Sequence, residues 1–216
     1  MYIGVDEAGR GPVLGSMFVG AVAVRNTTCL PGGIKDSKQL TPTRRAKLAK
    51  TIEQDARISN AIVEVPTDTI DAVPGELNQL TAQTMGRAIS NVIASEQLVE
   101  RVVVDACDPD VDRFAESVAH SIPDPIDIEA RHGADEAYPI VSAGSIIAKV
   151  ARDAHIGSLT QSYGDIGSGY PSDPTTRAFL STYIETHGDL PACARRSWQT
   201  SRDLLAAAEQ GTLENF

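Results

Sequence analysis

The sequence is poor in cysteine. Its 216 residues include three cysteines, Cys29, Cys107 and Cys193, which lie far apart and form no Cys-x-x-Cys pair. This spacing argues against a disulfide framework and against a structural zinc site. We therefore expect three reduced cysteines with no shared role.

The sequence also lacks a long apolar segment. No run of apolar residues approaches the roughly 18 residues that are needed to span a bilayer, so we expect no membrane partner. Met1 leads almost directly into a predicted strand, without the basic and apolar regions of a secretory signal. The predicted location is therefore the cytoplasm.

Positive charge is scarce. Lysine and arginine together number 19, against 29 aspartates and glutamates, for a net charge of -10, and only five of the basic residues are lysine. An acidic, lysine-poor composition fits a high-salt cytoplasm and suggests a halophile. The net charge alone disfavours a nucleic-acid partner, but local clusters of positive charge can override it.

The hydrophobic pattern predicts an α/β fold. Short segments rich in Val and Ile predict five strands, at residues 2–8, 16–25, 57–65, 101–106 and 126–131. Helical periodicity predicts a helix capped by Thr41, a long core helix over residues 138–159 that Asp135 opens, and a further helix that is capped by Asp173 and ends near Gly188. We expect one domain over residues 1–216, a mixed five-stranded sheet flanked by helices, with a helical C-terminal extension over about residues 172–216.

Four acids lie at the ends of predicted strands or at the start of a predicted helix. Asp6 and Glu7 end the first strand, Asp105 ends the 101–106 strand, and Asp135 opens the long helix. Side chains in such places can converge on one edge of a sheet. Two carboxylates about 4 Å apart repel by roughly 4 kcal/mol at an effective dielectric constant of about 20, so such a cluster requires shared protons or bound cations.

Oxygen-only ligands favour Mg²⁺ or Mn²⁺, and two such ions about 3.5–4 Å apart would form a phosphoryl-transfer site. The acids also have a structural interpretation, because Asp135 could be a helix N-cap and Asp105 a turn residue. Asp6 and Glu7, adjacent on an apolar strand, have no evident packing role. From spacing alone, both interpretations stay open.

Six segments extend the pattern over almost the whole chain: GVDEAGRGPVLGSM (4–17), DSKQLT (36–41), VVVDACD (102–108), ADEAYPIVSAGSIIAKVARD (134–153), GSGYPSDPTT (167–176) and RRSWQT (195–200). Together they resemble the archaeal members of the ribonuclease HII family. The resemblance implies an RNase H-like fold and a metal-dependent endoribonuclease, acting in DNA replication and ribonucleotide excision repair. It further implies cleavage of RNA–DNA hybrids, and cleavage on the 5′ side of single ribonucleotides in duplex DNA, giving 5′-phosphate and 3′-hydroxyl ends.

The resemblance also assigns roles to individual residues. It makes Asp6, Glu7, Asp105 and Asp135 the catalytic acids, which would hold two Mg²⁺ or Mn²⁺ ions. One ion would help to generate the attacking water and the other would stabilise the departing 3′ oxygen.

The turn Gly9-Arg10-Gly11 would lie beside the 2′-hydroxyl of the ribonucleotide, the group that distinguishes RNA from DNA. Neither glycine has a Cβ, which lets the main chain approach a nucleic-acid strand closely. Tyr170 would stack on the sugar of the next deoxyribonucleotide. Without the resemblance, a tight turn with an exposed arginine and a packing tyrosine is the simpler interpretation.

Contacts with backbone phosphates are expected from basic and hydroxyl side chains in the matching segments. The residues are Lys35, Ser37, Lys38, Lys149 and Arg196, with Arg152, Arg195 and Arg202 as further candidates. Any of them could instead be a solvated surface charge. His132, three residues before Asp135, could also touch the site.

Two positions depart from the pattern of the family. Gly133 stands where archaeal relatives commonly have lysine. Gly144 stands where alanine is usual. This glycine is expected to cost about 1 kcal/mol of helix stability.

Two other functions fit parts of the sequence. One is a catalytically silent nucleic-acid-binding protein on the same fold, and the other is a different Mg²⁺-dependent phosphoryl-transfer enzyme such as a small-molecule phosphatase. The expected partners are an RNA–DNA hybrid or ribonucleotide-containing duplex DNA, with a sliding clamp as a candidate partner of the tail EQGTLENF. A monomer is expected.

Overall fold

The structure, a computed structural model, describes residues 1–34, 40–93 and 98–213. The chain divides into two compact units. The first contains residues 1–8, 18–64 and 76–152, and the second contains residues 9–17, 65–75 and 153–216. That residues 1–216 form one domain stays a prediction, and the units are described separately.

The first unit is built on a mixed sheet. Its strands are β1 (Tyr2–Ala8), β2 (Met17–Val24), β3 (Ile58–Val65), β4 (Arg101–Asp105) and β5 (Ile128–Arg131). In the described residues the sheet has five strands in the order β3-β2-β1-β4-β5. Strand β1 is antiparallel to β2 and parallel to β4, and β4 is parallel to β5. The predicted mixed five-stranded sheet is therefore confirmed.

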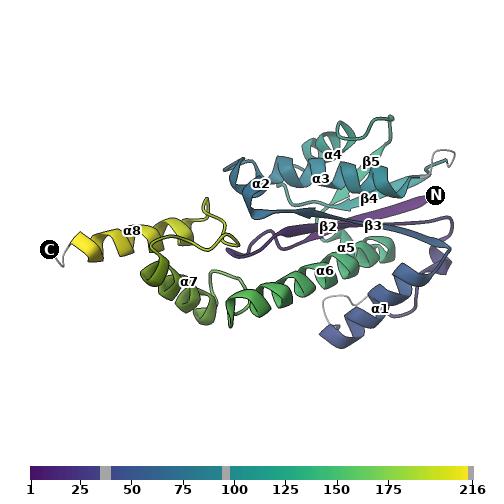
Figure 1. Ribbon diagram of the computed structural model, residues 1–216. Helices are drawn as coiled ribbons and strands as arrows, with labels where there is room; N and C mark the ends of the chain where they lie inside the picture. The colour runs from purple at the N-terminus through teal and green to yellow at the C-terminus, as the bar shows by residue number, and fades with distance from the viewer. Residues whose placement is uncertain (35–39, 94–97, 214–216) are drawn as a thin grey trace. The chain divides into compact units, whose positions relative to one another are not determined.

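Helices cover both faces of this sheet (Figure 1). Helices α3 (Leu77–Val92) and α4 (Val111–Ala119) lie over one face, and α1 (Pro42–Gln54) and the first part of α6 (Pro139–Tyr163) lie over the other. Successive strand residues point to opposite faces of the sheet, so the strands contribute to a hydrophobic core on each face. Ile3, Val5 and Val104 face α3 and α4. Val22 and Val103 face α1 and α6. Thr41 caps α1 through its hydroxyl, as predicted.

Glycines allow α6 to pack directly on the sheet. A Cβ placed on Gly20 would lie 2.4 Å from the carbonyl oxygen of Gly144, and one on Gly144 would lie 2.7 Å from the carbonyl oxygen of Gly20. A Cβ on Gly4 would meet the main chain of Ile140 at 2.3 Å. Gly144 is expected to lower helix stability, but it also permits a close helix–sheet contact that alanine would block.

The prediction that the long helix starts at Asp135 is wrong. A separate short helix, α5 (Ala134–Ala137), carries Asp135, and α6 begins after a break at Tyr138, whose backbone is extended. The reason is local: a residue before proline is disfavoured in the helical region, and Pro139 follows Tyr138. Gly133, with φ of 65°, is the N-cap of α5, so the alternative that Asp135 is an N-cap is also wrong.

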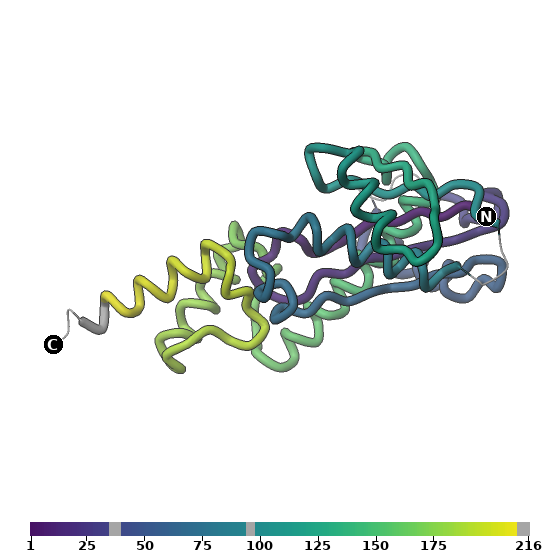
Figure 2. The backbone as a smooth tube through the Cα atoms, turned by 90° about the horizontal axis from the view of Figure 1, so that it is seen from above, coloured from purple at the N-terminus to yellow at the C-terminus, as the bar shows by residue number. Residues whose placement is uncertain are grey.

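The second unit is largely helical. It contains α2 (Thr67–Asp71), the end of α6, α7 (Pro174–His187) and α8 (Gln199–Leu213), and α7 and α8 lie side by side (Figure 2). Asp173 caps α7, and Gly188 ends it with φ of 74°, both as predicted. Among the residues that the structure describes, the remaining short elements are the 3₁₀ helix η1 (Thr27–Cys29) and irregular turns. No helix in the described residues is long and apolar enough to cross a membrane.

Candidate active site

Asp6 and Asp105 lie at neighbouring positions on two parallel strands. The paired register of β1 and β4 ends with Val5 opposite Val104, and each aspartate directly follows. Asp6 is buried, with 4 % of its surface exposed. The two carboxylates are close enough to repel each other. The expected convergence of these acids at one edge of the sheet is therefore present for this pair.

The pKa of Asp6 shows the electrostatic cost of this arrangement. Burial, reinforced by the negative charge of Asp105, holds the pKa of Asp6 well above its usual range. Three groups oppose the shift: the hydroxyl of Ser145, the ammonium of Lys149 and the N–H of Glu7, which donates to Asp6 Oδ1 at 2.7 Å. Burial and the charge of Asp105 together outweigh these three groups, Lys149 included.

Asp135 belongs to the same charged group through Lys149. It is buried in α5, with 3 % of its surface exposed, and its Oδ2 lies 4.0 Å from Lys149 Nζ. Lys149 also donates a hydrogen bond to the hydroxyl of Ser145 at 2.7 Å. The ammonium of Lys149 therefore lies among the acids. Its expected contact with a backbone phosphate stays a prediction.

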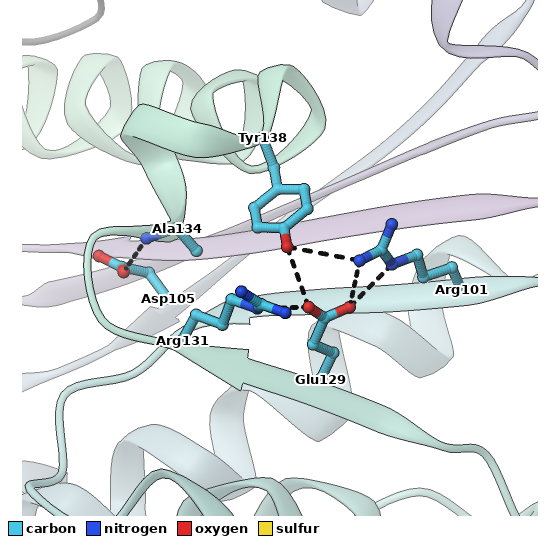
Figure 3. A network of polar contacts seen from close by, with 6 residues as sticks. All are labelled: Arg101, Asp105, Glu129, Arg131, Ala134 and Tyr138. Atoms are coloured by element: carbon cyan, nitrogen blue, oxygen red, sulfur yellow. Dashed lines mark hydrogen bonds and ion pairs between the residues drawn. The ribbon is translucent and has the colours of Figure 1, made fainter.

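Asp105 is tied to the start of α5. Its Oδ1 accepts a hydrogen bond from the N–H of Ala134 at 2.7 Å (Figure 3). His132 Nδ1 lies 3.1 Å from the carbonyl oxygen of Ala106, so His132 contacts the main chain directly after Asp105. Strand β4 and the segment that leads to Asp135 are thus joined at this point.

Glu7 directly follows Asp6 on β1. It is half-buried on β1, and adjacent residues of a strand point to opposite faces of the sheet. Its N–H contacts Asp6, as described above, but the register gives its carboxylate a different direction. Of the four predicted acids, Asp6, Asp105 and Asp135 are linked directly or through Lys149, and Glu7 is linked through its main chain.

The donor set fits a hard divalent cation in its chemistry. All four acids offer only oxygen ligands, which Mg²⁺ and Mn²⁺ prefer. Burial, and then the charge of Asp105, raise the pKa of Asp6, and a bound cation would favour the ionised form of this carboxylate. However, within residues 1–34, 40–93 and 98–213 no three His, Cys, Asp or Glu side chains are arranged as a ready-made metal cage.

In the second unit, the Gly9–Gly11 turn is held by residues from the C-terminal part of the chain. Arg195 is fully buried, and its guanidinium donates to the carbonyl oxygens of Gly15 at 3.0 Å, Arg10 at 2.7 Å and Gly9. The prediction that Arg195 contacts a phosphate is wrong, because its side chain is used inside the protein.

Tyr170 lies against the same turn. A Cβ added to Gly11 would be 3.5 Å from Tyr170 Cε1, and 41 % of the tyrosine surface is exposed. Trp198 Nε1 donates to the carbonyl oxygen of Gly11 at 3.2 Å, and Gly9 has φ of 88°. The structure thus places Tyr170 beside the Gly9–Gly11 turn, two features that the sequence links only through the family resemblance.

The remaining predicted phosphate contacts are dispersed. Arg196 is exposed and forms an ion pair with Asp189 at 2.5 Å, and Arg202 donates to the carbonyl oxygen of Ser197 at 2.7 Å. Lys35, Ser37 and Lys38 lie outside the described residues. Their roles stay predictions.

An α/β sheet with one buried and one half-buried acid at adjoining strand ends is the arrangement of a hydrolase with the RNase H-like fold. A family model described as Ribonuclease HII matches residues 3–201, and the chain belongs to this family. It is accordingly an endonuclease of ribonuclease H type 2, and membership supports ribonuclease H activity on RNA–DNA hybrids. Enzymes of this family depend on divalent metal ions.

Three known proteins illustrate the similarity. Ribonuclease HII of Haloarcula marismortui is 51% identical over 216 residues, covering 100% of both chains, and its halophilic source agrees with the interpretation of the composition. The crystal structure of ribonuclease H2 from Pyrococcus horikoshii OT3 has a TM-score of 0.89 at 38% identity and covers 97% of this chain and 99% of its own. A PCNA:RNase HII complex from Archaeoglobus fulgidus has a TM-score of 0.84 at 34% identity, covering 100% of each chain.

Proposed function

We propose that this protein is a metal-dependent endoribonuclease that cleaves the RNA strand of RNA–DNA hybrids and cuts on the 5′ side of single ribonucleotides in duplex DNA. The products would carry 5′-phosphate and 3′-hydroxyl ends. The observation that carries the proposal is the buried Asp6 carboxylate beside Asp105, with Lys149 as partial compensation. Such a cluster has a chemical use when it holds a cation, and its position at adjoining strand ends leaves it able to meet a substrate.

In this proposal Asp6, Glu7, Asp105 and Asp135 hold two Mg²⁺ or Mn²⁺ ions. When bound, the ions would lower the pKa of the attacking water and stabilise negative charge on the departing 3′ oxygen. The carboxylates of the chain would fix both ions relative to the scissile phosphate. Lys149 would limit the repulsion among the acids before the ions arrive.

Recognition of the ribonucleotide is assigned to the second unit. Gly9, Arg10 and Gly11 would contact the 2′-hydroxyl, and Tyr170 would stack on the next sugar. Supporting this, Gly9 has a left-handed backbone and Gly11 leaves the space beside the exposed Tyr170 ring open. Phosphates would be contacted by Lys149 and Arg196, and by Lys35, Ser37 and Lys38, which lie outside the described residues.

A sliding clamp is a further proposed partner, supported by the structural likeness to the PCNA:RNase HII complex. The end of the tail that would bind it, including Phe216, lies outside the described residues. A monomer in the cytoplasm, active in replication and ribonucleotide excision repair, remains the accompanying hypothesis.

The test uses an end-labelled DNA duplex that contains one ribonucleotide, with an all-DNA duplex as the substrate control. Wild type and Asp105→Asn are incubated with Mg²⁺, with Mn²⁺ or with EDTA, over a range of KCl concentrations. We expect one metal-dependent cut on the 5′ side of the ribonucleotide by wild type, and none of the all-DNA duplex. Asp55→Asn, which breaks an exposed ion pair with Arg57 at the end of α1, is the matched control and should cleave normally.

The alternatives give different results. Binding without cleavage under every condition would indicate a silent nucleic-acid-binding protein. Hydrolysis of a small phosphate ester in place of the duplex would indicate a phosphatase.

A further inference from the structure

The Glu129 carboxylate contacts three side chains, those of Arg101, Arg131 and Tyr138, in the same region of the sheet as Asp105 (Figure 3). Its Oε2 forms an ion pair with Arg101 Nη2 at 2.6 Å, and its Oε1 accepts a hydrogen bond from the Tyr138 hydroxyl at 2.9 Å. Arg131 also pairs with Oε1. Although burial raises the pKa of Glu129, the hydrogen bonds from Arg101, Tyr138 and Arg131 outweigh it, and the net pKa is lowered.

The sheet register explains why these residues meet. Arg101 opens β4, while Glu129 and Arg131 are two residues apart on β5 and therefore share one face. Arg131 stands opposite Asp105 in the parallel register. Both guanidinium groups lie over the Tyr138 ring: Arg101 Cζ is 5.1 Å and Arg131 Cζ is 5.8 Å from the ring centroid. Tyr138 is thus anchored to both strands.

Tyr138 is also the junction of α5 and α6. Its N–H donates to the carbonyl oxygen of Ala134 at 2.9 Å and closes α5. Its carbonyl oxygen accepts from the N–H groups of Val141 at 2.9 Å and Ser142 at 3.0 Å, which begin α6. The Ser142 hydroxyl in turn donates to the carbonyl oxygen of Asp135. The backbone around Asp135 is therefore fixed through this junction.

Helix α5 has only four residues, too few to be stable by itself. It is held at its start by Asp105, which accepts from the Ala134 N–H, and at its end by Tyr138, which is anchored to Glu129. Asp135 lies between these two attachments. The direction of its carboxylate consequently depends on both.

We infer that Tyr138 and Glu129 are positioning residues for the metal site: they fix α5 so that Asp135 stays aligned with Asp105. This inference rests on the proposed metal-binding role of the acids. Neither residue is assigned a contact with substrate or ion. They act through the backbone of α5, as partners behind metal ligands commonly do.

The test measures Mn²⁺ binding directly, by electron paramagnetic resonance on the full-length protein without nucleic acid. Tyr138→Phe removes only the hydroxyl, and Glu129→Ala removes the acceptor. We expect each to weaken Mn²⁺ binding by about 10-fold, the lower range for such partners. The double variant should be no weaker than Glu129→Ala, because both changes break one connection. Glu129→Gln keeps an oxygen for the Tyr138 hydroxyl and should recover part of the affinity.

A kinetic readout separates positioning from general destabilisation. At limiting Mn²⁺ the variants should cleave slowly, and at saturating Mn²⁺ they should approach the wild-type rate. Asp55→Asn, matched as an exposed ion pair, should leave Mn²⁺ affinity unchanged. Variants that melt earlier yet bind Mn²⁺ like wild type would overturn the inference. If wild type itself binds no Mn²⁺, the proposed metal site is what fails.

Discussion

Arg195 holds the main chain of Arg10: its Nη1 donates to the carbonyl oxygen of Arg10 at 2.7 Å, across 185 residues of sequence. The same guanidinium donates hydrogen bonds to the carbonyl oxygens of Gly9 and Gly15. Its Cζ lies 4.7 Å from the centroid of the Trp198 ring. A buried arginine that satisfies several carbonyl groups makes the conformation of the turn depend on the C-terminal segment.

Replacing Arg195 with lysine should therefore destabilise the protein and impair the turn. One ammonium group lacks the planar fork that reaches three carbonyls, and each buried carbonyl left without a donor costs about 1–3 kcal/mol. We expect a lower melting temperature, and at least about 10-fold slower cleavage of a ribonucleotide-containing duplex. Calorimetry and single-turnover kinetics measure the two effects.

The neighbouring Arg196→Lys is the control for the stability measurement. Arg196 is exposed and paired with Asp189, and such surface pairs contribute about 0.2–1 kcal/mol. Its melting temperature should stay close to that of wild type. Equal melting temperatures for Arg195→Lys and wild type would contradict the structural role of Arg195.

Asp6→Asn should lower the cleavage activity without lowering the stability of the protein. The amide removes a buried charge that Asp105 repels, while an oxygen remains to accept from the N–H of Glu7. We expect cleavage to fall by more than about 100-fold, beyond the loss typical of residues behind a metal ligand. The free energy of unfolding, measured in urea, should be unchanged or higher. A variant that is inactive and also clearly less stable would indicate that Asp6 is mainly structural.

The elements that could be predicted from sequence are those specified by near neighbours. Thr41 and Asp173 cap their helices, and Gly188 ends α7, because each acts on backbone groups within a few residues. The short segments rich in Val and Ile predicted the positions of the strands, though not the order in which the strands pair. The acids at the ends of β1 and β4 were recognised because parallel neighbours bring such ends together.

Other features depend on contacts that no local pattern contains. Arg195 looks like a surface charge, since arginine is rarely fully buried, and its acceptors are main-chain groups of a distant turn. The clustering of Arg101, Glu129 and Tyr138 requires the parallel register of β4 and β5. The break before Pro139, by contrast, can be predicted from the sequence, because a residue that precedes proline is disfavoured in the helical conformation.

Acid should weaken the loop that presents Tyr170, because Asp173 anchors it. The carboxylate accepts from the N–H groups of Ser168 at 2.6 Å and Thr175 at 2.9 Å. Hydrogen bonds from Ser168, then from Thr175, lower the pKa of Asp173 below its ordinary value. A lowered folded-state pKa stabilises the protein above the unfolded pKa, and this contribution disappears as the pH falls through the folded value.

The measurement compares melting temperatures of wild type and Asp173→Asn from pH 7 down to pH 2. The difference should be largest near neutral pH, where the carboxylate is ionised in both states. It should shrink below about pH 4, as the wild-type carboxylate takes up its proton. A difference that does not vary with pH would show that the charge of Asp173 is unimportant.

The last prediction concerns two glycines on α6 with opposite surroundings. A Cβ on Gly144 would lie 2.7 Å from the carbonyl oxygen of Gly20 and 3.2 Å from that of Gly4, all main-chain atoms that cannot swing aside. Gly144→Ala should therefore destabilise the protein by about 1–3 kcal/mol, although alanine favours helices.

Gly157 on the same helix is the matched control, because a Cβ there would meet no atom within 4 Å. Gly157→Ala should stabilise the protein by up to about 1 kcal/mol, since only helix propensity changes. Urea unfolding of both variants measures the two signs. If Gly144→Ala were as stable as Gly157→Ala, α6 would not pack on the sheet as closely as the positions of Gly4, Gly20 and Gly144 require.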